Sequence, residues 1–254
     1  MLALRASEAW LEQYKRVWRG TLTTTVVNPV LYLAAIGLGL GSLVNRNGNV
    51  PGGGTYLHFV APGLLAAAVM QVATQESSWP VNGAVRWTRV YLAQLATPLG
   101  VREVMLGHQL FVALRVATTG ATYLAVIAAF GAARSPYAAL VLPSALLLGT
   151  AFSAPTAAFA AHIESDNAFN PFFRFGIVPM FLFSGTFFPV SRLPLPLEWL
   201  AYATPLWHGV ALCRDLTLGH GSLLADLGHA GYLALWTVGG LWLAERSYRR
   251  RLVR

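Results

Sequence analysis

The stretch Phe181-Leu-Phe-Ser-Gly-Thr-Phe-Phe-Pro189, followed by Pro205-Leu-Trp-His208 and then Arg214, decides how this chain is interpreted. It ends one hydrophobic span without starting another, because the charge-free run 199–213 is shorter than the about 20 residues that a membrane-crossing helix needs. Prolines at 189, 194, 196 and 205 interrupt the segment further. Non-helical backbone at membrane depth is tolerated only where protein buries it or water reaches it. We therefore predict re-entrant half-helices that line a pathway or form a gate.

The composition indicates an integral membrane protein. Hydrophobic residues make up 56% of the 254 residues, charged residues 11%, and the mean hydropathy is +0.54, whereas about a quarter of a soluble domain is charged. The single cysteine, Cys213, excludes a disulfide framework within the chain and a cysteine zinc cluster. Charges from Glu8 to Arg19 interrupt any early apolar core, so the N-terminus does not have the pattern of a signal peptide.

Charge-poor windows predict an all-α fold with six transmembrane helices. They lie at about 21–43, 57–78, 105–130, 138–162, 171–188 and 224–244, with the re-entrant half-helices between the fifth and the sixth. We see no internal repeat and predict one transmembrane domain, 1–254, in which an interfacial helix 1–20 precedes a six-span bundle 21–254.

Basic residues predict the orientation. Thirteen lie before span one, after span two, at the start of span five and after span six, whereas the opposite loops hold four: Arg46, Arg134, Arg192 and Arg214. By the positive-inside rule both termini are cytoplasmic. The net charge of +8 then reflects topology and contact with anionic lipids, and no nucleic-acid partner is predicted.

Two segments on the predicted cytoplasmic side carry helical patterns. Residues 7–18 place Trp10, Tyr14 and Trp18 on one apolar face, as in an amphipathic helix that lies on the membrane surface; a simple basic anchor is the alternative. The loop Val81 to Arg102 predicts a short helix, Thr88–Ala96, stopped by Pro98. That helix is either a solvated connector or a docking element for another protein.

Ionisable groups at membrane depth are costly and are usually placed for a reason. Glu76 lies at the inner end of span two, and His108 and Arg115 share a face of span three. We favour a structural Glu76–Arg115 ion pair over a proton relay, because the other spans supply no acids at the midplane.

Motifs of enzymes are absent. Ser184 lies in Leu-Phe-Ser-Gly, without the glycine two residues earlier that a nucleophile elbow needs, and no metal-ligand spacing occurs. Since Lys15 is the single lysine, the chain contains no Gly-x-x-x-x-Gly-Lys phosphate loop. We predict no catalytic, cofactor or metal site in this chain, so that any ATP must bind to another chain.

The chain resembles the permease subunits of type-2 ABC exporters, the ABC-2 family, and within it the lipo-oligosaccharide (nodulation-factor) and daunorubicin-resistance permeases. The resemblance rests on the N-terminal helix, the six spans, Ala61-Pro-Gly63 and Glu76 in span two, Ser184-Gly-Thr-Phe-Phe-Pro189, and Pro205-Leu-Trp-His208 with Arg214 beyond it.

This resemblance implies a bacterial inner-membrane exporter of an amphipathic drug, lipid or glycolipid that works by alternating access. It implies a homodimer, or a heterodimer with a sister permease, that binds two cytoplasmic ATPase subunits carrying the ATP and magnesium. The coupling residues would be Arg86, Thr88, Arg89, Tyr91, Leu92, Leu95, Thr97 and Pro98, and the outer gate residues would be Ser184, Gly185, Pro189, Pro205, His208 and Arg214.

Two other classes remain as alternatives. A secondary transporter would carry midplane carboxylates for coupling ions and often an inverted repeat, and an intramembrane enzyme would carry one of the absent motifs. Co-purification of an ATP-binding subunit distinguishes the three classes. The identity of the substrate does not follow from the sequence.

Overall fold

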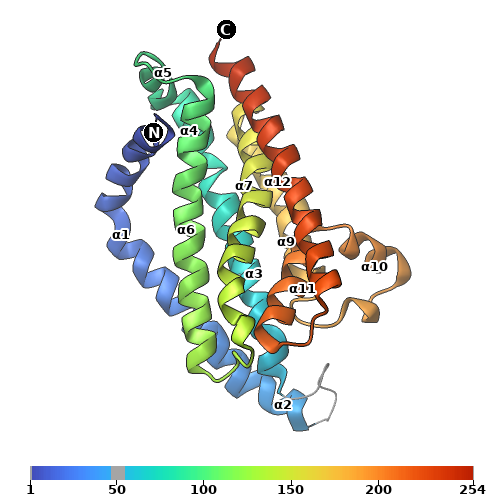
Figure 1. Ribbon diagram of the computed structural model, residues 1–254. Coiled ribbons are helices and arrows are strands. Elements are labelled where there is room, and N and C mark those ends of the chain that lie inside the picture. Colours follow the sequence, from blue (N-terminus) through green and yellow to red (C-terminus); the bar gives the residue numbers. More distant parts are fainter. Residues whose placement is uncertain (1, 47–54, 254) are drawn as a thin grey trace.

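The computed structural model describes residues 2–46 and 55–253, and the regular elements in these ranges are all helices (Figure 1). The label η denotes a 3-10 or π-helical segment. The elements are α1 Leu2–Ala34, η1 Ala35–Leu40, α2 Gly41–Arg46, α3 Tyr56–Glu76, α4 Trp79–Arg86, α5 Val90–Leu95, α6 Val101–Ala129, η2 Pro136–Leu140, α7 Val141–His162, η3 Asp166–Ala168, α8 Phe169–Pro171, η4 Phe172–Ile177, α9 Val178–Phe183, η5 Val190–Arg192, α10 Leu195–Tyr202, α11 Pro205–Leu218 and α12 Leu223–Leu252.

Helix α3 is the central helix of the bundle. It packs against α6, α7 and α11, and most of its residues are buried. Its sequence is apolar on every face, which is typical of a helix that other helices surround. Thr55 caps its first turn, because the Thr55 hydroxyl and backbone N–H both lie within hydrogen-bond distance of His58 Nδ1, at 2.7 and 3.2 Å. These contacts fix the start of the helix that connects the two ends of the molecule.

Two long helices flank this centre, α1 along α6 and α12 along α7. Helix α12 has 30 residues, and at 1.5 Å per residue it is about 45 Å long, more than the about 30 Å of a hydrocarbon core. Figure 1 shows the start of α1 and the end of α12 at the same end of the bundle as α5, with α2 at the opposite end.

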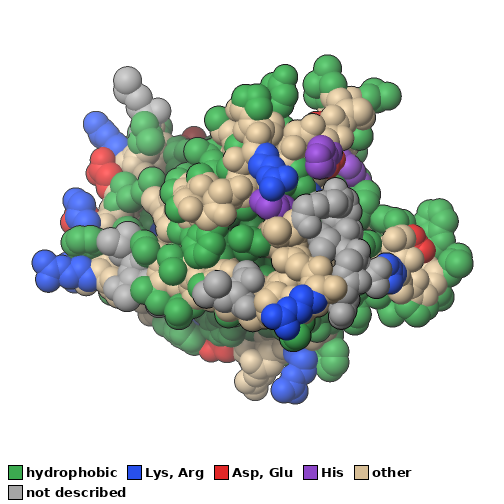
Figure 2. All heavy atoms as spheres, turned by 90° about the horizontal axis from the view of Figure 1, so that it is seen from below, with side chains coloured by type: hydrophobic (Ala, Val, Ile, Leu, Met, Phe, Trp, Pro, Cys, Tyr) green, Lys and Arg blue, Asp and Glu red, His purple; other side chains and the backbone are tan. Residues whose placement is uncertain are grey.

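The outer surface is apolar over large areas. Figure 2, seen from the end opposite α5, shows hydrophobic side chains out to the edges of the molecule. On α12, Leu235 is 74% exposed, Val238 67% and Trp242 60%. Because soluble proteins rarely expose contiguous apolar surface of this extent, these faces suit contact with lipid or with another membrane helix.

Within residues 2–46 and 55–253, three helical stretches are long and apolar enough to cross a membrane: Tyr56–Arg86, Val101–Ala129 and Pro136–His162. They cover the predicted spans two, three and four, except for residue 130. The windows predicted for spans one and six are also helical, in α1 to α2 and in α12. The predicted all-α fold is confirmed for the described residues, and the count of six crossings stays a prediction.

Two predicted boundaries are wrong. The short helix predicted on the cytoplasmic side begins at Val90 rather than Thr88, since the preceding Arg89 adopts a left-handed conformation with φ of 52°. The helix of the predicted fifth span ends at Phe183 rather than 188, where the chain turns into a non-helical loop. The division into an interfacial helix 1–20 and a bundle from residue 21 stays a prediction, and the described residues on both sides of position 20 lie in one helix, α1.

The start of α1 packs on protein. Ala6 and Trp10 are buried, and the Trp10 ring lies 4.6 Å from the ring of His108 and 5.9 Å from that of Phe111, both on α6. The amphipathic pattern was interpreted correctly as a helix with one buried face. The prediction that Trp10 faces lipid is wrong, because α6 covers it.

Candidate functional site

The first candidate region is the α4–α5 end of the bundle. Of the residues predicted to contact an ATPase, Thr88, Arg89, Leu92, Thr97 and Pro98 are exposed, and Arg86 and Leu95 are half-buried. Arg86 forms an ion pair of 3.4 Å with Asp166 of η3. Trp87, which the sequence did not single out, is 61% exposed beside them. This end therefore presents a short helix and a mixed basic and apolar surface.

Tyr91 is not part of that surface. It is fully buried, its hydroxyl lies 3.3 Å from the hydroxyl of Tyr248 on α12, and its ring lies edge-on to Trp10. Gln94 also faces inward and donates to the backbone carbonyl of Ala6 at 3.0 Å. Because Tyr91 fixes α5 to α1 and α12, it cannot touch a partner as the sequence-based assignment requires, although it can transmit a displacement of α5.

The predicted ion pair inside the bundle is confirmed. Arg115 Nε donates to Glu76 Oε1 at 3.0 Å, and the side chains are 7% and 24% exposed. Arg115 also donates to the hydroxyl of Tyr14 at 2.9 Å and lies over its ring. The pair thus connects α1, α3 and α6. Tyr14 was not predicted as a partner, because helical periodicity placed it on a lipid face.

His108 does not join this pair. It is completely buried on α6 against Trp10, and neither ring nitrogen has a hydrogen-bond partner among the described residues. His108 and Arg115 share a helix face as predicted, because both side chains are buried in the bundle. Their contacts differ, so the two do not form a relay with each other.

The second candidate region is the segment from Ser184 to Leu218 that the sequence predicts to be re-entrant, here called the re-entrant segment, which lies at the lower half of the bundle beside α3 and α12 (Figure 1). Gly185 has a φ of +81°, a conformation that glycine adopts without strain, and this turn ends the fifth predicted span. The buried hydroxyls of Ser184 and Thr186 lie 3.0 Å apart. Pro189 and Pro205 stand at the start of η5 and in the first turn of α11, where no helical N–H is required.

Arg214 holds this segment together. It donates to the carbonyl of Gly185 at 2.8 Å and to the carbonyl of Phe59 at 3.1 Å, and its guanidinium lies 4.0 Å from the centroid of the Phe59 ring. Both carbonyls are fixed backbone acceptors, so the planar donor group suits this position better than a lysine ammonium would. Arg214 therefore fastens α11 and the Gly185 turn to the first turns of α3.

Two further contacts fasten the same loop to α3. The Tyr56 hydroxyl donates to the carbonyl of Phe187 at 2.8 Å. A Cβ atom at Gly63 would lie 3.0 Å from the Cα of Thr186, so the absence of a side chain permits the close approach. The sequence pointed to Gly63 through the family resemblance but did not identify Tyr56 or Phe59, because their contacts are with backbone distant in the chain.

His208, in contrast, packs against α10 and α12. Its Nδ1 is 2.8 Å from Nδ1 of His229 on α12, its Nε2 is 3.1 Å from the carbonyl of Tyr202, and its ring stacks on Tyr232 at 3.9 Å. The residues predicted for the gate thus separate into two groups. Ser184, Gly185 and Arg214 lie against α3, whereas His208 connects α10 and α11 to α12. Within residues 2–46 and 55–253, no three His, Cys, Asp or Glu side chains lie together as metal ligands would.

The comparison with known families covers both regions. A model of the ABC-2 type transporter family matches residues 7–218, from the first turns of α1 to the end of α11. The chain belongs to the ABC-2 type transporter family. It is similar over nearly its full length to proteins named Nodulation protein J. The identity is 31% over 248 residues to that of Rhizobium leguminosarum bv. trifolii (96% of this chain and 93% of the relative), and 30% over 239 residues to that of Neorhizobium galegae (94% and 89%).

The ABC-2 family is a family of membrane transport components and not of ATPases. Membership agrees with the apolar helices of the bundle and with a multi-pass inner-membrane protein. In this ABC-2 chain, α3 contacts both candidate regions, because its first turns bind the re-entrant segment and its C-terminal end leads through Ser77 and Ser78 into α4.

Proposed function

We propose that this chain is the permease subunit of an ATP-driven exporter that moves an amphipathic substrate out of the cytoplasm by alternating access. The family membership supports this, and one observation carries it further: a single buried helix, α3, joins the exposed α4–α5 end to the re-entrant segment. Such a helix can transmit a displacement from a cytoplasmic partner to an outer gate.

The proposed transmission begins at α5. An ATPase subunit would contact the exposed Arg89 and Leu92, and ATP-driven closure of two ATPase subunits would press on α5 and α4. Tyr91 and Gln94, which face inward, pass the displacement to α1 and α12. Because α4 continues into α3, the same displacement acts along α3 to the Arg214 contacts.

The Glu76–Arg115 pair makes this transmission rigid. It lies at the inner end of α3 and fixes that end to α6 and, through Tyr14, to α1. A paired charge at this depth avoids the cost of an isolated one. The pair is therefore a structural element of the permease in this proposal, and no proton passes through it.

The proposed partners come from the family resemblance, with which the chain's own residues agree. Since the chain contains no phosphate loop, ATP and magnesium would bind to separate ATPase subunits, and the resemblance implies two per complex. The pathway would lie between this permease and a second permease, either an identical copy or a sister chain. Both termini would be cytoplasmic, as the distribution of arginines indicates.

The proposed substrate is an amphipathic drug, lipid, or glycolipid or oligosaccharide, and we favour the last class. The support is the similarity to proteins named Nodulation protein J over more than 90% of this chain, together with the resemblance noted above to lipo-oligosaccharide permeases. Aromatic residues on the re-entrant segment and on α9 suit contact with acyl chains and sugar rings.

Affinity purification of the chain from its native membrane tests the assignment. We expect an ATP-binding subunit to co-purify and the reconstituted complex to transport only when ATP is supplied. Transport by the chain alone, driven by a proton or sodium gradient, would instead assign it to the secondary transporters.

A further inference from the structure

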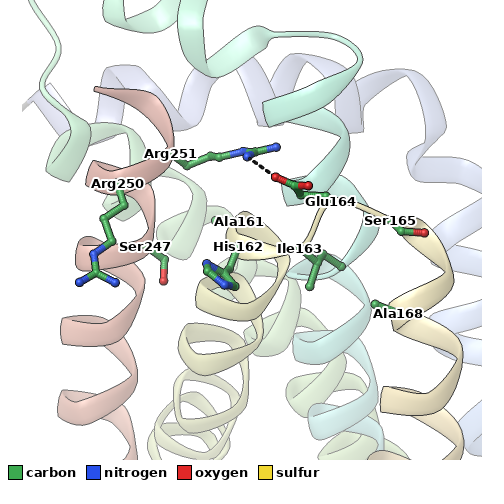
Figure 3. A pocket seen from close by; sticks show the side chains of 9 residues that line it. All are labelled: Ala161, His162, Ile163, Glu164, Ser165, Ala168, Ser247, Arg250 and Arg251. Atoms are coloured by element: carbon green, nitrogen blue, oxygen red, sulfur yellow. Dashed lines mark hydrogen bonds and ion pairs between the residues drawn. The ribbon is translucent and has the colours of Figure 1, made fainter. Parts of the chain in front are cut away.

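A basic pocket of about 640 Å³ lies at the α5 end of the molecule, between α7 and the last turns of α12. Neither the proposed gate nor the proposed ATPase surface uses it. Figure 3 shows the residues that line it, which come from the end of α7, the connection to η3 and the face of α12: Ala161, His162, Ile163, Glu164, Ser165, Ala168, Ser247, Arg250 and Arg251.

The charges around the pocket are unequal. Arg251 forms an ion pair of 3.4 Å with Glu164, whose side chain is 82% exposed. Among the described residues no carboxylate pairs with Arg250. Figure 3 shows the Arg250 and Arg251 side chains pointing apart, that of Arg251 toward Glu164 and that of Arg250 away from it, with Ser247 and His162 between them. Two arginines against one glutamate leave a net positive charge, and Arg250, Ser247 and His162 can all donate hydrogen bonds.

Apart from Ser165, the remaining residues of the pocket are apolar. Ala161, Ile163 and Ala168 line it, and one turn before Ser247 on the same face of α12 lies Leu243, which is 46% exposed. Trp242 is 60% exposed beside it, with Arg246 over its ring at 5.5 Å. Along α12 an apolar and aromatic surface thus changes to a basic one, the pattern of a helix at the boundary between acyl chains and headgroups.

We propose that this pocket binds a phosphate-bearing anion, namely the phosphate of an anionic phospholipid headgroup. Arg250 would contact the phosphate oxygens in the forked geometry that guanidinium groups favour, Ser247 and His162 would donate to the same headgroup, and Arg251, which pairs with Glu164, would add positive charge beside it. The acyl chains would lie along the surface around Leu243. Basic pockets between membrane helices at the cytoplasmic side suit this class of ligand, whereas a free phosphate would make no use of the apolar stripe.

The experiment measures retained lipid. The full-length chain is reconstituted in nanodiscs of phosphatidylcholine with a minor fraction of phosphatidylglycerol or cardiolipin, extracted in mild detergent, and weighed by native mass spectrometry. We expect anionic lipid to be retained and Arg250→Gln to weaken retention by about tenfold, the loss of one charge-assisted hydrogen bond. Glu164→Gln should strengthen it, because it frees Arg251 and removes the negative charge.

Arg249→Gln is the matched control. It removes one charge from the same turn of α12, but Arg249 pairs with Glu245 at 2.8 Å and does not line this pocket. If Arg249→Gln retains as much anionic lipid as the unaltered protein, the result supports the site. If Arg249→Gln and Arg250→Gln lose lipid equally, the site is overturned in favour of a diffuse basic surface. Melting temperatures in phosphatidylcholine alone check that both variants fold.

A second experiment distinguishes a lipid headgroup from free phosphate as the ligand. Inorganic phosphate is titrated into the chain in phosphatidylcholine nanodiscs, with the melting temperature as readout. Binding of lipid but not of inorganic phosphate, dependent on Arg250, supports the headgroup site. If inorganic phosphate binds equally well, or if Arg250→Gln leaves lipid retention unchanged and instead weakens binding of the ATPase subunit, the lipid proposal is wrong.

Discussion

The Glu76–Arg115 pair allows the sharpest quantitative prediction. Glu76→Gln removes the charge that compensates Arg115, whose side chain is 7% exposed, while Arg115→Gln leaves a Glu76 that is 24% exposed and closer to water. Removing one partner of a fully buried pair costs about 3–5 kcal/mol. Because this pair is partly exposed, we expect about 3 kcal/mol for Glu76→Gln and about 2 kcal/mol for Arg115→Gln.

The two changes together should cost less than their sum. In the double variant no charge remains stranded, so we expect a coupling of about 1–3 kcal/mol. Tyr14→Phe removes the third partner of Arg115, a hydrogen bond of 2.9 Å, and should cost about 1 kcal/mol. Thermal unfolding in one detergent, followed through a fluorescence or light-scattering signal, measures all four variants.

Two results would refute this reasoning. Simple additivity of Glu76→Gln and Arg115→Gln would mean that the side chains do not interact. If Arg115→Gln lowers the stability clearly more than Glu76→Gln does, burial of the remaining charge does not decide which change costs more stability.

Three further predictions concern other parts of the chain. Gly63→Val should displace the Thr186 loop and lower both the melting temperature and transport, whereas the control Gly231→Val, with open space around it, should leave transport intact; equal effects would show that the close approach is not important. Leu92→Asp, on the exposed face of α5, should preserve expression and dimerisation but abolish transport-stimulated ATPase activity, while Tyr91→Ala should unfold the α5 end, at about 3–5 kcal/mol for loss of a buried aromatic side chain; normal coupling in Leu92→Asp would reduce α5 to a connector. The purified chain alone should neither bind nor hydrolyse ATP, because Lys15 is its single lysine and lies in α1; specific hydrolysis by the isolated chain would contradict the subunit assignment.

The helices could be predicted because apolar runs and prolines are local signals. Spans two, three and four follow directly from charge-poor windows that α3, α6 and α7 occupy. The Glu76–Arg115 contact could also be predicted, because two opposite charges at similar depth have a strong reason to meet. These inferences need no knowledge of how the helices are arranged.

The remainder depends on tertiary packing that no local pattern encodes. An apolar helix face must be covered, but the pattern around Trp10 does not say whether lipid or α6 covers it. Arg214 binds two backbone carbonyls, which every residue carries, so sequence does not indicate which ones. Tyr91 looked like a surface residue because its partner Tyr248 is 157 positions away.

The most direct test of the account measures whether the re-entrant segment moves when the partner ATPase binds ATP. Trp199 on α10 is 69% exposed, so Trp199→Cys in a Cys213→Ala background can carry one spin label per permease. The distance between the labels of the two permeases in the complex is then measured by pulsed electron resonance, with and without a non-hydrolysable ATP analogue. The account predicts one distance distribution without the ATP analogue and a different one with it. In Leu92→Asp, the distribution should no longer change when the analogue is added. A single unchanged distribution in a complex that hydrolyses ATP and transports would contradict it.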